Sequence, residues 1–516
     1  MGRMRSGAVH SASEGRSASR LALPREGGES RDALAMTVSA PVSAPPPSGL
    51  PASEAPRSGR SPRWPLLVLL GGVGLLPALI AVAQLGRIHP DEVYQLLEPA
   101  WFRAHGYGVL AWEWRSGLRN WAMPGLAAWL LRLADVLGLT HPVAYRALIA
   151  VPQVALHGWM SWATYRYAER RVGRPGGLFA LLAVGLYGPV LIFAGRTLGE
   201  SLSTAFLVVA LEALDRTERP VRAGLVGGLA LGLAVVARYG SAVVVLAALV
   251  WLAAAWRWRV LAFACLGGLA VALGLGALDW ATWGKPFHSF FAYVDFNVLS
   301  GQAARQFGAS PPGFYLEPFL SGLPLWLWAV LPQGLSSLRR RFALPLPLFC
   351  AGAYLLAITT TAHKEERFLY PALVLLTLAA APALAALVLG RANVRSRWGL
   401  GAVALATTLL AGHFFPPVDL RGDQFRAIVK ATRGEGASGL LIVNEGLWGA
   451  GGFFYIGKNI PWSTCDWPHD ANFQAAMRDR RFNRAVTFEG RALAELQSAG
   501  FRVVGRVGRE TVLARD

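Results

Sequence analysis

The chain has 516 residues, of which 54% are hydrophobic and only 16% are charged. Soluble domains carry about 25% charged residues, so this composition excludes an ordinary soluble protein. The net charge of +19 would suit a nucleic-acid binder, but the basic residues form short clusters between long apolar runs. That pattern indicates a protein that crosses a membrane several times, and we expect no nucleic-acid partner.

Residues 1–64 are rich in Ser, Pro, Gly and Arg and show no apolar periodicity, which predicts a disordered N-terminal tail. The first apolar run, 65–86, is long enough to cross a hydrocarbon core of about 30 Å. Ala81-Val82-Ala83 resembles a signal-peptidase site, but the run is longer than a signal-peptide core and the preceding tail is too long. We therefore expect a retained signal anchor.

Ten further apolar segments predict membrane-spanning helices, which gives a polytopic α-helical bundle of about eleven spans. These segments are 143–168, 176–194, 200–214, 223–237, 241–256, 259–278, 318–336, 343–361, 368–389 and 398–415. The apolar stretch 124–139 predicts an interfacial or re-entrant helix.

The arginines of the short loops predict the orientation. The short loops on the same side of the membrane as the N-terminus contain fourteen arginines, whereas the short loops on the other side contain four basic residues. Because basic loops stay in the cytoplasm, we expect a cytoplasmic N-terminus and extracytoplasmic loops at 87–142 and 281–317. The tail 416–516 would also lie outside, and its short apolar runs and helical patterns predict a small α/β domain. Only four of the 50 basic residues are lysine, and this excess of arginine favours a bacterial genome. We therefore expect the plasma (inner) membrane as the location. A eukaryotic chain would lie in the endoplasmic reticulum membrane.

Polar and charged residues gather in these extracytoplasmic loops. The first loop contains His89-Pro90-Asp91-Glu92, Glu98, Tyr107, Trp112-Glu113-Trp114 and Arg119, the second contains Asp279 and Asn297, the third contains His363-Lys364-Glu365-Glu366-Arg367, and a short loop contains Arg196. Because the loops share one membrane face, we expect their acids, histidines and cations to converge on one site.

Each cluster also has a structural interpretation. Asp91 and Glu92 could cap a helix start, where negative charge meets the positive end of the helix dipole. The tryptophans could form an interfacial aromatic belt, and the third loop could hold only exposed ion pairs. Asp279 and Asn297 could be helix caps, and Arg196 could pair with Glu200 one helical turn later.

Three of these segments resemble, in the same order, motifs of the family-22 glycosyltransferases, the GT-C-fold mannosyltransferases that include the ALG-type and GPI-anchor enzymes. The motifs are His89-Pro90-Asp91-Glu92 with Gly106-Tyr107-Gly108 and Trp112-Glu113-Trp114, then Asp279 through Trp283-Gly284 to Phe296-Asn297, and then His363 to Phe368. The resemblance implies a GT-C transmembrane domain at 65–415, after a cytoplasmic tail at 1–64 and before an extracytoplasmic domain at 416–516. The chain departs from the family pattern at Arg238-Tyr239, where Arg-Pro is common.

The resemblance implies an inverting transfer of mannose from polyprenyl-phosphate mannose to a hydroxyl of a glycan or lipid-linked acceptor. Asp91 would be the general base, and Glu92 would orient the acceptor or tune the pKa of Asp91. The leaving phosphate needs cationic partners, for which the candidates are His363, Lys364, Arg367, Arg119 and Arg196. The substrate-binding candidates are His89, Glu98, Tyr107, Trp112, Glu113, Trp114, Asp279, Asn297 and Glu365.

No metal or cofactor is expected, because the sequence shows no D-x-D pair or ligand spacing and its three cysteines are far apart. The expected partners are the lipid-phosphate sugar donor, the acceptor and membrane lipids. One alternative is a GT-C enzyme that transfers arabinose, glucose or an aminosugar, and nothing in the residues excludes it. A lipid or sugar transporter would place ionisable residues near the membrane midplane, whereas here they cluster at span ends. A receptor or scaffold would leave the motif loops without a function.

Overall fold

The computed structural model describes residues 64–331, 344–412, 421–444, 446, 449–468 and 471–516. The predicted disorder of the N-terminal tail lies outside these residues, as do parts of the predicted spans 318–336, 343–361 and 398–415. The described residues belong to one compact unit, Pro62–Asp516.

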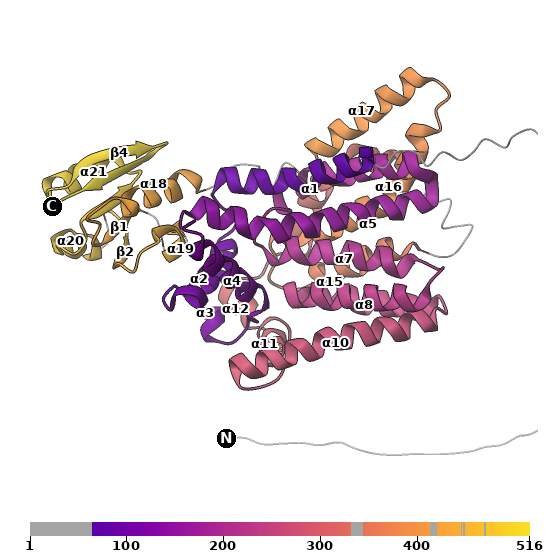
Figure 1. Cartoon of the computed structure of the whole chain (residues 1–516), viewed down its shortest axis with the longest axis horizontal. Helices are drawn as coiled ribbons and strands as arrows, with labels where there is room; N and C mark the ends of the chain where they lie inside the picture. Colours follow the sequence, from indigo (N-terminus) through magenta and orange to yellow (C-terminus); the bar gives the residue numbers. More distant parts are fainter. Residues whose placement is uncertain (1–63, 332–343, 413–420, 445, 447–448, 469–470) are drawn as a thin grey trace, which may run out of the picture. The chain divides into compact units, whose positions relative to one another are not determined.

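Helices occupy the predicted apolar segments and pack side by side (Figure 1). They are α1 (Trp64–Gln84), α5 (Pro142–Gly185), α6 (Gly188–Phe193), α7 (Gly199–Asp215), α8 (Pro220–Ala237), α9 (Ala242–Ala254), α10 (Trp258–Trp283), α13 (Leu316–Gly322), α15 (Leu346–Thr360), α16 (Tyr370–Leu389) and α17 (Val394–Leu410). Their shared core contains fully buried side chains such as Tyr187, Leu211 and Leu373.

Helix α5 contains a reversal. Val172 and Gly173 leave the helical conformation, and Gly173 adopts φ +73°, which glycine tolerates because it has no Cβ. Residues twelve apart in a straight helix are about 18 Å apart. Here a Cβ at Gly177 would instead lie 3.0 Å from the ring of Tyr165, so the chain packs back on itself. The first arm of α5 corresponds to the predicted span 143–168, and its second arm together with the separate helix α6 covers the predicted span 176–194.

By length and apolar composition, four described helices are able to cross a membrane: Leu66–Gln84, Pro220–Ala237, Trp258–Trp283 and Glu366–Leu389. The pair Pro312–Gly322 and Leu325–Leu331, bent by 96°, gives a fifth span if it is counted as one. The other described helices do not meet this criterion by themselves, so the count of eleven spans stays a prediction.

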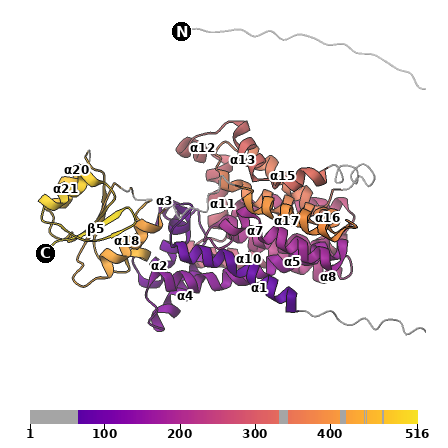
Figure 2. The same ribbon diagram turned by 90° about the horizontal axis from the view of Figure 1, so that it is seen from above.

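The loops that were predicted to be extracytoplasmic fold into short helices at one end of the bundle (Figures 1 and 2). These are η1 (Glu92–Leu97), α2 (Glu98–His105), α3 (Trp112–Arg115), α4 (Ala122–Val136), η2 (Tyr239–Ser241), α11 (His288–Val294), η3 (Asp295–Leu299), α12 (Gln302–Phe307), η4 (Pro312–Tyr315) and η5 (Glu366–Leu369). The predicted helix at 124–139 is α4.

The C-terminal residues form the predicted α/β structure. Its elements are α18 (Gly422–Arg433), β1 (Leu440–Val443), α19 (Gly452–Ile456), β2 (Trp462–Cys465), α20 (Ala471–Arg478), β3 (Arg484–Thr487), α21 (Gly490–Ser498), β4 (Arg502–Val507) and β5 (Glu510–Ala514). The sheet has the order β2-β1-β3-β5-β4, and β1 pairs in parallel with β2 and β3. Strand β5 runs antiparallel to both of its neighbours.

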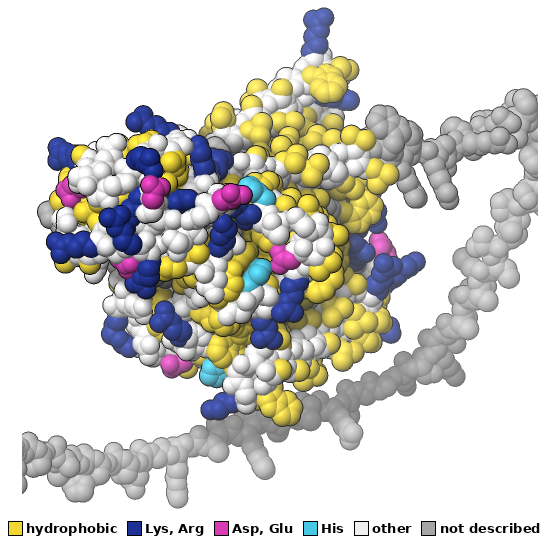
Figure 3. All heavy atoms as spheres, turned by 60° about the vertical axis from the view of Figure 1, so that its left-hand side comes forward, with side chains coloured by type: hydrophobic (Ala, Val, Ile, Leu, Met, Phe, Trp, Pro, Cys, Tyr) yellow, Lys and Arg dark blue, Asp and Glu magenta, His cyan; other side chains and the backbone are white. Residues whose placement is uncertain are grey.

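This α/β structure packs on the first long loop. Phe425 of α18 and Phe454 of α19 share a buried core with Val93 and Trp101. The Tyr455 hydroxyl also donates to the carbonyl of Leu85 at 3.0 Å. In Figure 3 many charged side chains gather at this end of the molecule, whereas hydrophobic side chains cover the side of the bundle. The segment that carries the first predicted motif is therefore held from both sides, by the helices and by the C-terminal residues.

Candidate active site

A cavity of about 310 Å³ lies where the three predicted motifs meet. It is lined by His89, Pro90, Asp91, Tyr94, Gln95, Trp112, Glu113, Leu118, Arg119, Arg238, Tyr293, Phe296, Asn297, Phe307, His363, Glu365, Arg367 and Phe368. The convergence predicted from the shared membrane face is therefore present. The volume lies within the range of small-molecule sites, about 300–1,000 Å³.

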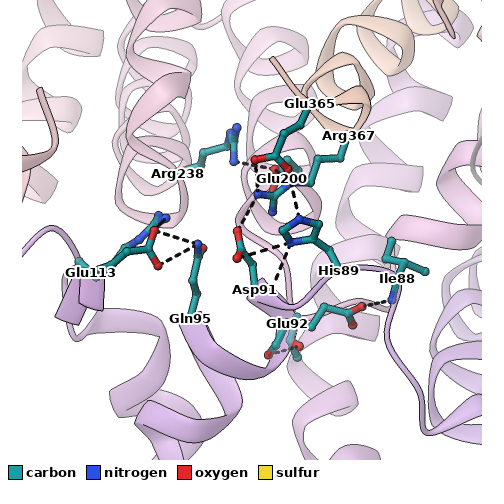
Figure 4. A network of polar contacts seen from close by, with 12 residues as sticks. Ile88, His89, Asp91, Glu92, Gln95, Glu113, Glu200, Arg238, Glu365 and Arg367 are labelled. Carbon is teal, nitrogen blue, oxygen red and sulfur yellow. Dashed lines mark hydrogen bonds and ion pairs between the residues drawn. The ribbon is translucent and has the colours of Figure 1, made fainter. Parts of the chain in front are cut away.

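Acidic and basic side chains form a network of contacts along one wall of this cavity (Figure 4). Asp91 Oδ2 lies 2.7 Å from Nη2 of Arg367, whose Nε lies 2.6 Å from Glu365 Oε2. His89 stands between the two acids, with Nδ1 3.5 Å from Asp91 and Nε2 3.2 Å from Glu365. His363 Nε2 approaches the other oxygen of Glu365 at 3.1 Å. Residues from the first and third motifs, far apart in the sequence, therefore contact each other directly.

These contacts set the charges. Burial would raise the pKa of Asp91, but the Arg367 guanidinium, together with His89, holds that pKa well below its usual range. Burial would likewise raise the pKa of Glu365, yet His363, His89 and Arg367 lower it strongly. For His89, burial and Arg367 oppose the charged form, but hydrogen bonds to Asp91 and Glu365 outweigh them and raise its pKa. Asp91 is therefore an ionised carboxylate at neutral pH, with cationic partners.

The chain turn at Pro90 directs Asp91 into the cavity. Pro90 cannot donate a backbone hydrogen bond, and its carbonyl accepts from Val93 and Tyr94 to start the π-helical turn η1. Asp91 is the N-cap of η1, but its side chain makes no capping hydrogen bond. The capping interpretation is therefore wrong for Asp91, whose carboxylate faces Arg367.

The opposite wall contains aromatic and amide groups. Arg119 Nη2 lies 2.5 Å from Glu113 Oε1, and the Gln95 amide donates to the same carboxylate at 3.3 Å. The Trp112 ring packs on Phe296 and Phe307, with centroid distances of 4.9 and 5.7 Å. Flat aromatic faces beside polar groups suit a sugar ring, which has an apolar face and hydroxyl edges.

Two important residues were not among the sequence-based candidates. Glu200 is 1% exposed, and its Oε1 lies 2.7 Å from Arg238 Nη1 and 3.4 Å from Arg367 Nε. It therefore holds two guanidinium groups beside the cavity. Arg238 also lies over the Phe368 ring at 4.6 Å. The signal was available in the sequence, because both residues are ionisable and stand at the ends of apolar runs.

The structure does not bring three predicted residues to the cavity. Glu92 is fully buried and accepts from the Ile88 N–H at 2.7 Å, with Arg196 Nη1 at 4.0 Å. Arg196 also donates to the Gly86 carbonyl at 3.1 Å. Lys364 is buried, and its Nζ donates to two backbone carbonyls, at 2.5 and 3.0 Å. We therefore remove Glu92 as an acceptor-orienting group and Arg196 and Lys364 as phosphate ligands, since all three stabilise the surrounding backbone.

Four further candidates also lie elsewhere. Asp279 is buried inside α10 and accepts from the backbone N–H and hydroxyl of Ser289 in α11, whose N-cap position is Phe287. Trp114 is buried and donates from its indole to the Tyr94 carbonyl at 3.0 Å. Glu98 accepts from backbone N–H groups, and Tyr107 lines a second cavity. Within the described residues, no group of three or more His, Cys, Asp or Glu side chains is arranged to hold a metal ion.

Comparison with known proteins identifies the family. The model of the Alg9-like mannosyltransferase family matches residues 73–417. The chain belongs to this family. The resemblance to the family-22 glycosyltransferases is thereby confirmed.

Curated relatives carry the name GPI mannosyltransferase 3. The protein from Yarrowia lipolytica is 30% identical over 332 residues, which is 63% of this chain and 63% of the relative. The protein from Gibberella zeae is 29% identical over 355 residues, 57% of this chain and 56% of the relative. The chain thus spans less than two thirds of the length of these relatives.

A solved structure shows the same fold. ArnT from Cupriavidus metallidurans, in a crystal structure bound to undecaprenyl phosphate, superposes with a TM-score of 0.58 at 15% identity, covering 87% of this chain and 98% of ArnT. The predicted GT-C-type architecture is therefore confirmed.

Proposed function

We propose that this protein is a membrane mannosyltransferase that moves mannose from polyprenyl-phosphate mannose to a hydroxyl of a glycan or lipid-linked acceptor. The observation that carries the proposal is the ionised Asp91 carboxylate, which lines the cavity beside Arg367, His89 and Arg119. A carboxylate and several cations in one small cavity suit a reaction in which a hydroxyl loses a proton while a phosphate leaves.

The acceptor oxygen would attack C1 of the mannose from the face opposite the phosphate. The bond from C1 to the phosphate oxygen breaks, the polyprenyl phosphate leaves with the electron pair, and the anomeric configuration inverts. Asp91 accepts the hydroxyl proton as the new bond forms. Arg367, Arg238 and Arg119 are the cations of the cavity that would neutralise the phosphate.

The ion pair between Asp91 and Arg367 also bears on the strength of the base. This contact lowers the pKa of Asp91, which makes it a weak proton acceptor. A phosphate that shares the Arg367 guanidinium would weaken the contact and raise the basicity of Asp91. The base would therefore become effective when the donor is bound.

The family and the names of the relatives support mannose as the sugar and a GPI-type glycolipid as one class of acceptor. The undecaprenyl phosphate bound to ArnT supports a polyprenyl-phosphate carrier in this fold. No metal ion has a part in the proposed step. The orientation that we propose puts the cavity outside the cytoplasm, because the opposite end of the bundle carries the arginine-rich loops, including Arg170, Arg171 and Arg216.

The test is a transfer assay with purified protein in lipid vesicles and radiolabelled polyprenyl-phosphate mannose, with the lipid extract of the source cells as acceptor. We expect Asp91→Asn to lower kcat by about 10²–10⁴-fold, the usual contribution of a general base. Asp295→Asn is the matched control, because Asp295 is an exposed carboxylate of η3 that does not line the cavity.

Two results would contradict the proposal. Wild-type turnover by Asp91→Asn would remove Asp91 as the base. A clear preference for polyprenyl-phosphate glucose or arabinose over the mannose donor would keep the reaction class but change the sugar.

A further inference from the structure

A second cavity, of about 420 Å³, lies between the first long loop and the C-terminal α/β structure. It shares no lining residue with the cavity around Asp91. The loop side contributes Trp101 and Tyr107, and the C-terminal side contributes Arg433 and Lys458. The cavity thus exists only because the C-terminal residues pack on the loop.

Aromatic rings form one part of the lining. The Trp101 and Tyr107 rings meet edge to face with centroids 6.0 Å apart, and Tyr145 packs against Trp101 in the same way at 5.8 Å. Trp101 and Tyr145 are buried, whereas Tyr107 is partly exposed. His105 stacks on Trp101 with ring centroids 3.8 Å apart, so Tyr107 is the ring of this group that offers exposed surface to the cavity. A rigid aromatic ring binds the apolar face of a sugar ring at little cost in side-chain entropy.

The rest of the lining supplies hydrogen-bonding groups and cations. His105 Nε2 lies 3.0 Å from Asp135 Oδ2, which fixes an acid at the cavity edge. Arg433 donates from Nη2 to the Thr140 carbonyl at 2.6 Å, and its buried Nε–H has no hydrogen-bond partner among the described residues. Lys458 Nζ donates to the Gly434 carbonyl at 3.1 Å, and an ammonium has further donors to offer.

We propose that this second cavity binds a saccharide that carries a phosphate group. The Tyr107 ring would pack on the sugar ring, Asp135 would accept from a sugar hydroxyl, and Arg433 and Lys458 would bind the phosphate. One carboxylate against two basic side chains, Arg433 and Lys458, favours an anionic ligand over a neutral sugar. The ligand is either a free sugar phosphate or the inositol phosphate headgroup of a lipid.

The experiment is isothermal titration calorimetry on the full chain in lipid nanodiscs. In the first arm, mannose 6-phosphate and mannose are titrated separately. In the second arm, mannose 6-phosphate is titrated into nanodiscs with and without phosphatidylinositol 4-phosphate, because a bound lipid headgroup would compete with this soluble probe. We expect mannose 6-phosphate to bind more tightly than mannose, and Lys458→Ala to weaken its binding by about tenfold through the loss of one charge-assisted contact. Tyr107→Leu should weaken both sugars.

Lys430→Ala is the matched control, because Lys430 is an exposed lysine of α18 that does not line the cavity. Asp91→Asn should leave this binding unchanged, which separates the second cavity from the proposed transfer reaction. The inference is overturned if neither ligand binds, if mannose and mannose 6-phosphate bind equally, or if Lys458→Ala retains wild-type affinity. Displacement by the lipid would identify the headgroup as the ligand, and binding of only the soluble probe would identify a free sugar phosphate.

Discussion

Glu200 offers a sharp test of the electrostatics of the proposed active site. This buried carboxylate lies 2.7 Å from Arg238 and 3.4 Å from Arg367, and both cations line the cavity. Glu200→Gln keeps the shape of the side chain but removes its charge. The attraction between unit charges about 3.4 Å apart is about 5 kcal/mol at an effective dielectric constant of 20. Breaking a buried ion pair costs about 3–5 kcal/mol of folding free energy, so we expect a clear fall in thermal stability.

The kinetic consequence has a defined sign. Without Glu200 the cavity gains one unit of positive charge, so a donor phosphate should bind more tightly and KM for the donor should fall. Arg367 would then rely more on Asp91, whose contact is 2.7 Å, and the basicity of Asp91 should fall with it. We therefore expect kcat to fall as well. Polyprenyl phosphate alone should restore more thermal stability to the variant than to the wild type, because the anion compensates the unpaired cations.

The matched control is Glu212→Gln. Glu212 is 2% exposed and also holds two arginines, Arg170 and Arg216, but at the opposite end of the bundle. It should lose comparable stability with no change in donor KM and no recovery by polyprenyl phosphate. The assays are thermal inactivation with and without polyprenyl phosphate and steady-state transfer kinetics. A raised donor KM with unchanged kcat in Glu200→Gln, or equal recovery of both variants, would refute the reasoning.

Three further predictions concern pH, packing and metal. Burial raises the pKa of Glu98 from 4.5 to about 7 even though the backbone N–H groups of Val109 and Phe454 oppose the shift. The folded state therefore holds the proton of Glu98 more tightly than the unfolded state does. The free energy of unfolding should fall by on the order of 3 kcal/mol between pH 4.5 and 7 and then level off. Thermal unfolding measured against pH tests this, and a flat profile would contradict the shift. Gly452 has φ +68°, and a Cβ there would lie 2.3 Å from the Glu98 carboxyl carbon. Gly452→Ala should therefore lower the free energy of unfolding by at least about 2 kcal/mol and expose α19 to proteolysis. Gly490→Ala is the control and should do neither, because the space around Gly490 is open. Transfer should persist in EDTA, and a complete loss that Mn²⁺ restores would overturn the metal-free proposal.

The sequence determined where the helices lie and which loops share a site. Long apolar runs can be stable in a bilayer only as helices, because the helix satisfies its own backbone hydrogen bonds, so α7, α8 and α10 fall where the hydropathy predicted them. Successive loops alternate between the two ends of the bundle, so the positions of the motifs along the chain predicted that Asp91 and Arg367 would lie at the same end, and they contact each other there. These features depend on composition along the chain and need no knowledge of packing.

Only the tertiary structure decided which of the neighbouring polar side chains face the cavity. Asp91 and Glu92 are adjacent, but successive side chains of a helical turn point in different directions, so Asp91 meets Arg367 whereas Glu92 is fully buried and accepts from the Ile88 N–H. Lys364 donates to the carbonyl of Thr361 in its own loop and to the carbonyl of Ser310, which is distant in the sequence, and no local pattern predicts the second contact. The partnership of Glu200 with Arg238 and Arg367 depends on how three helix ends pack together. Such contacts arise from the fold as a whole, because a buried charge takes whichever partner the packing brings within reach.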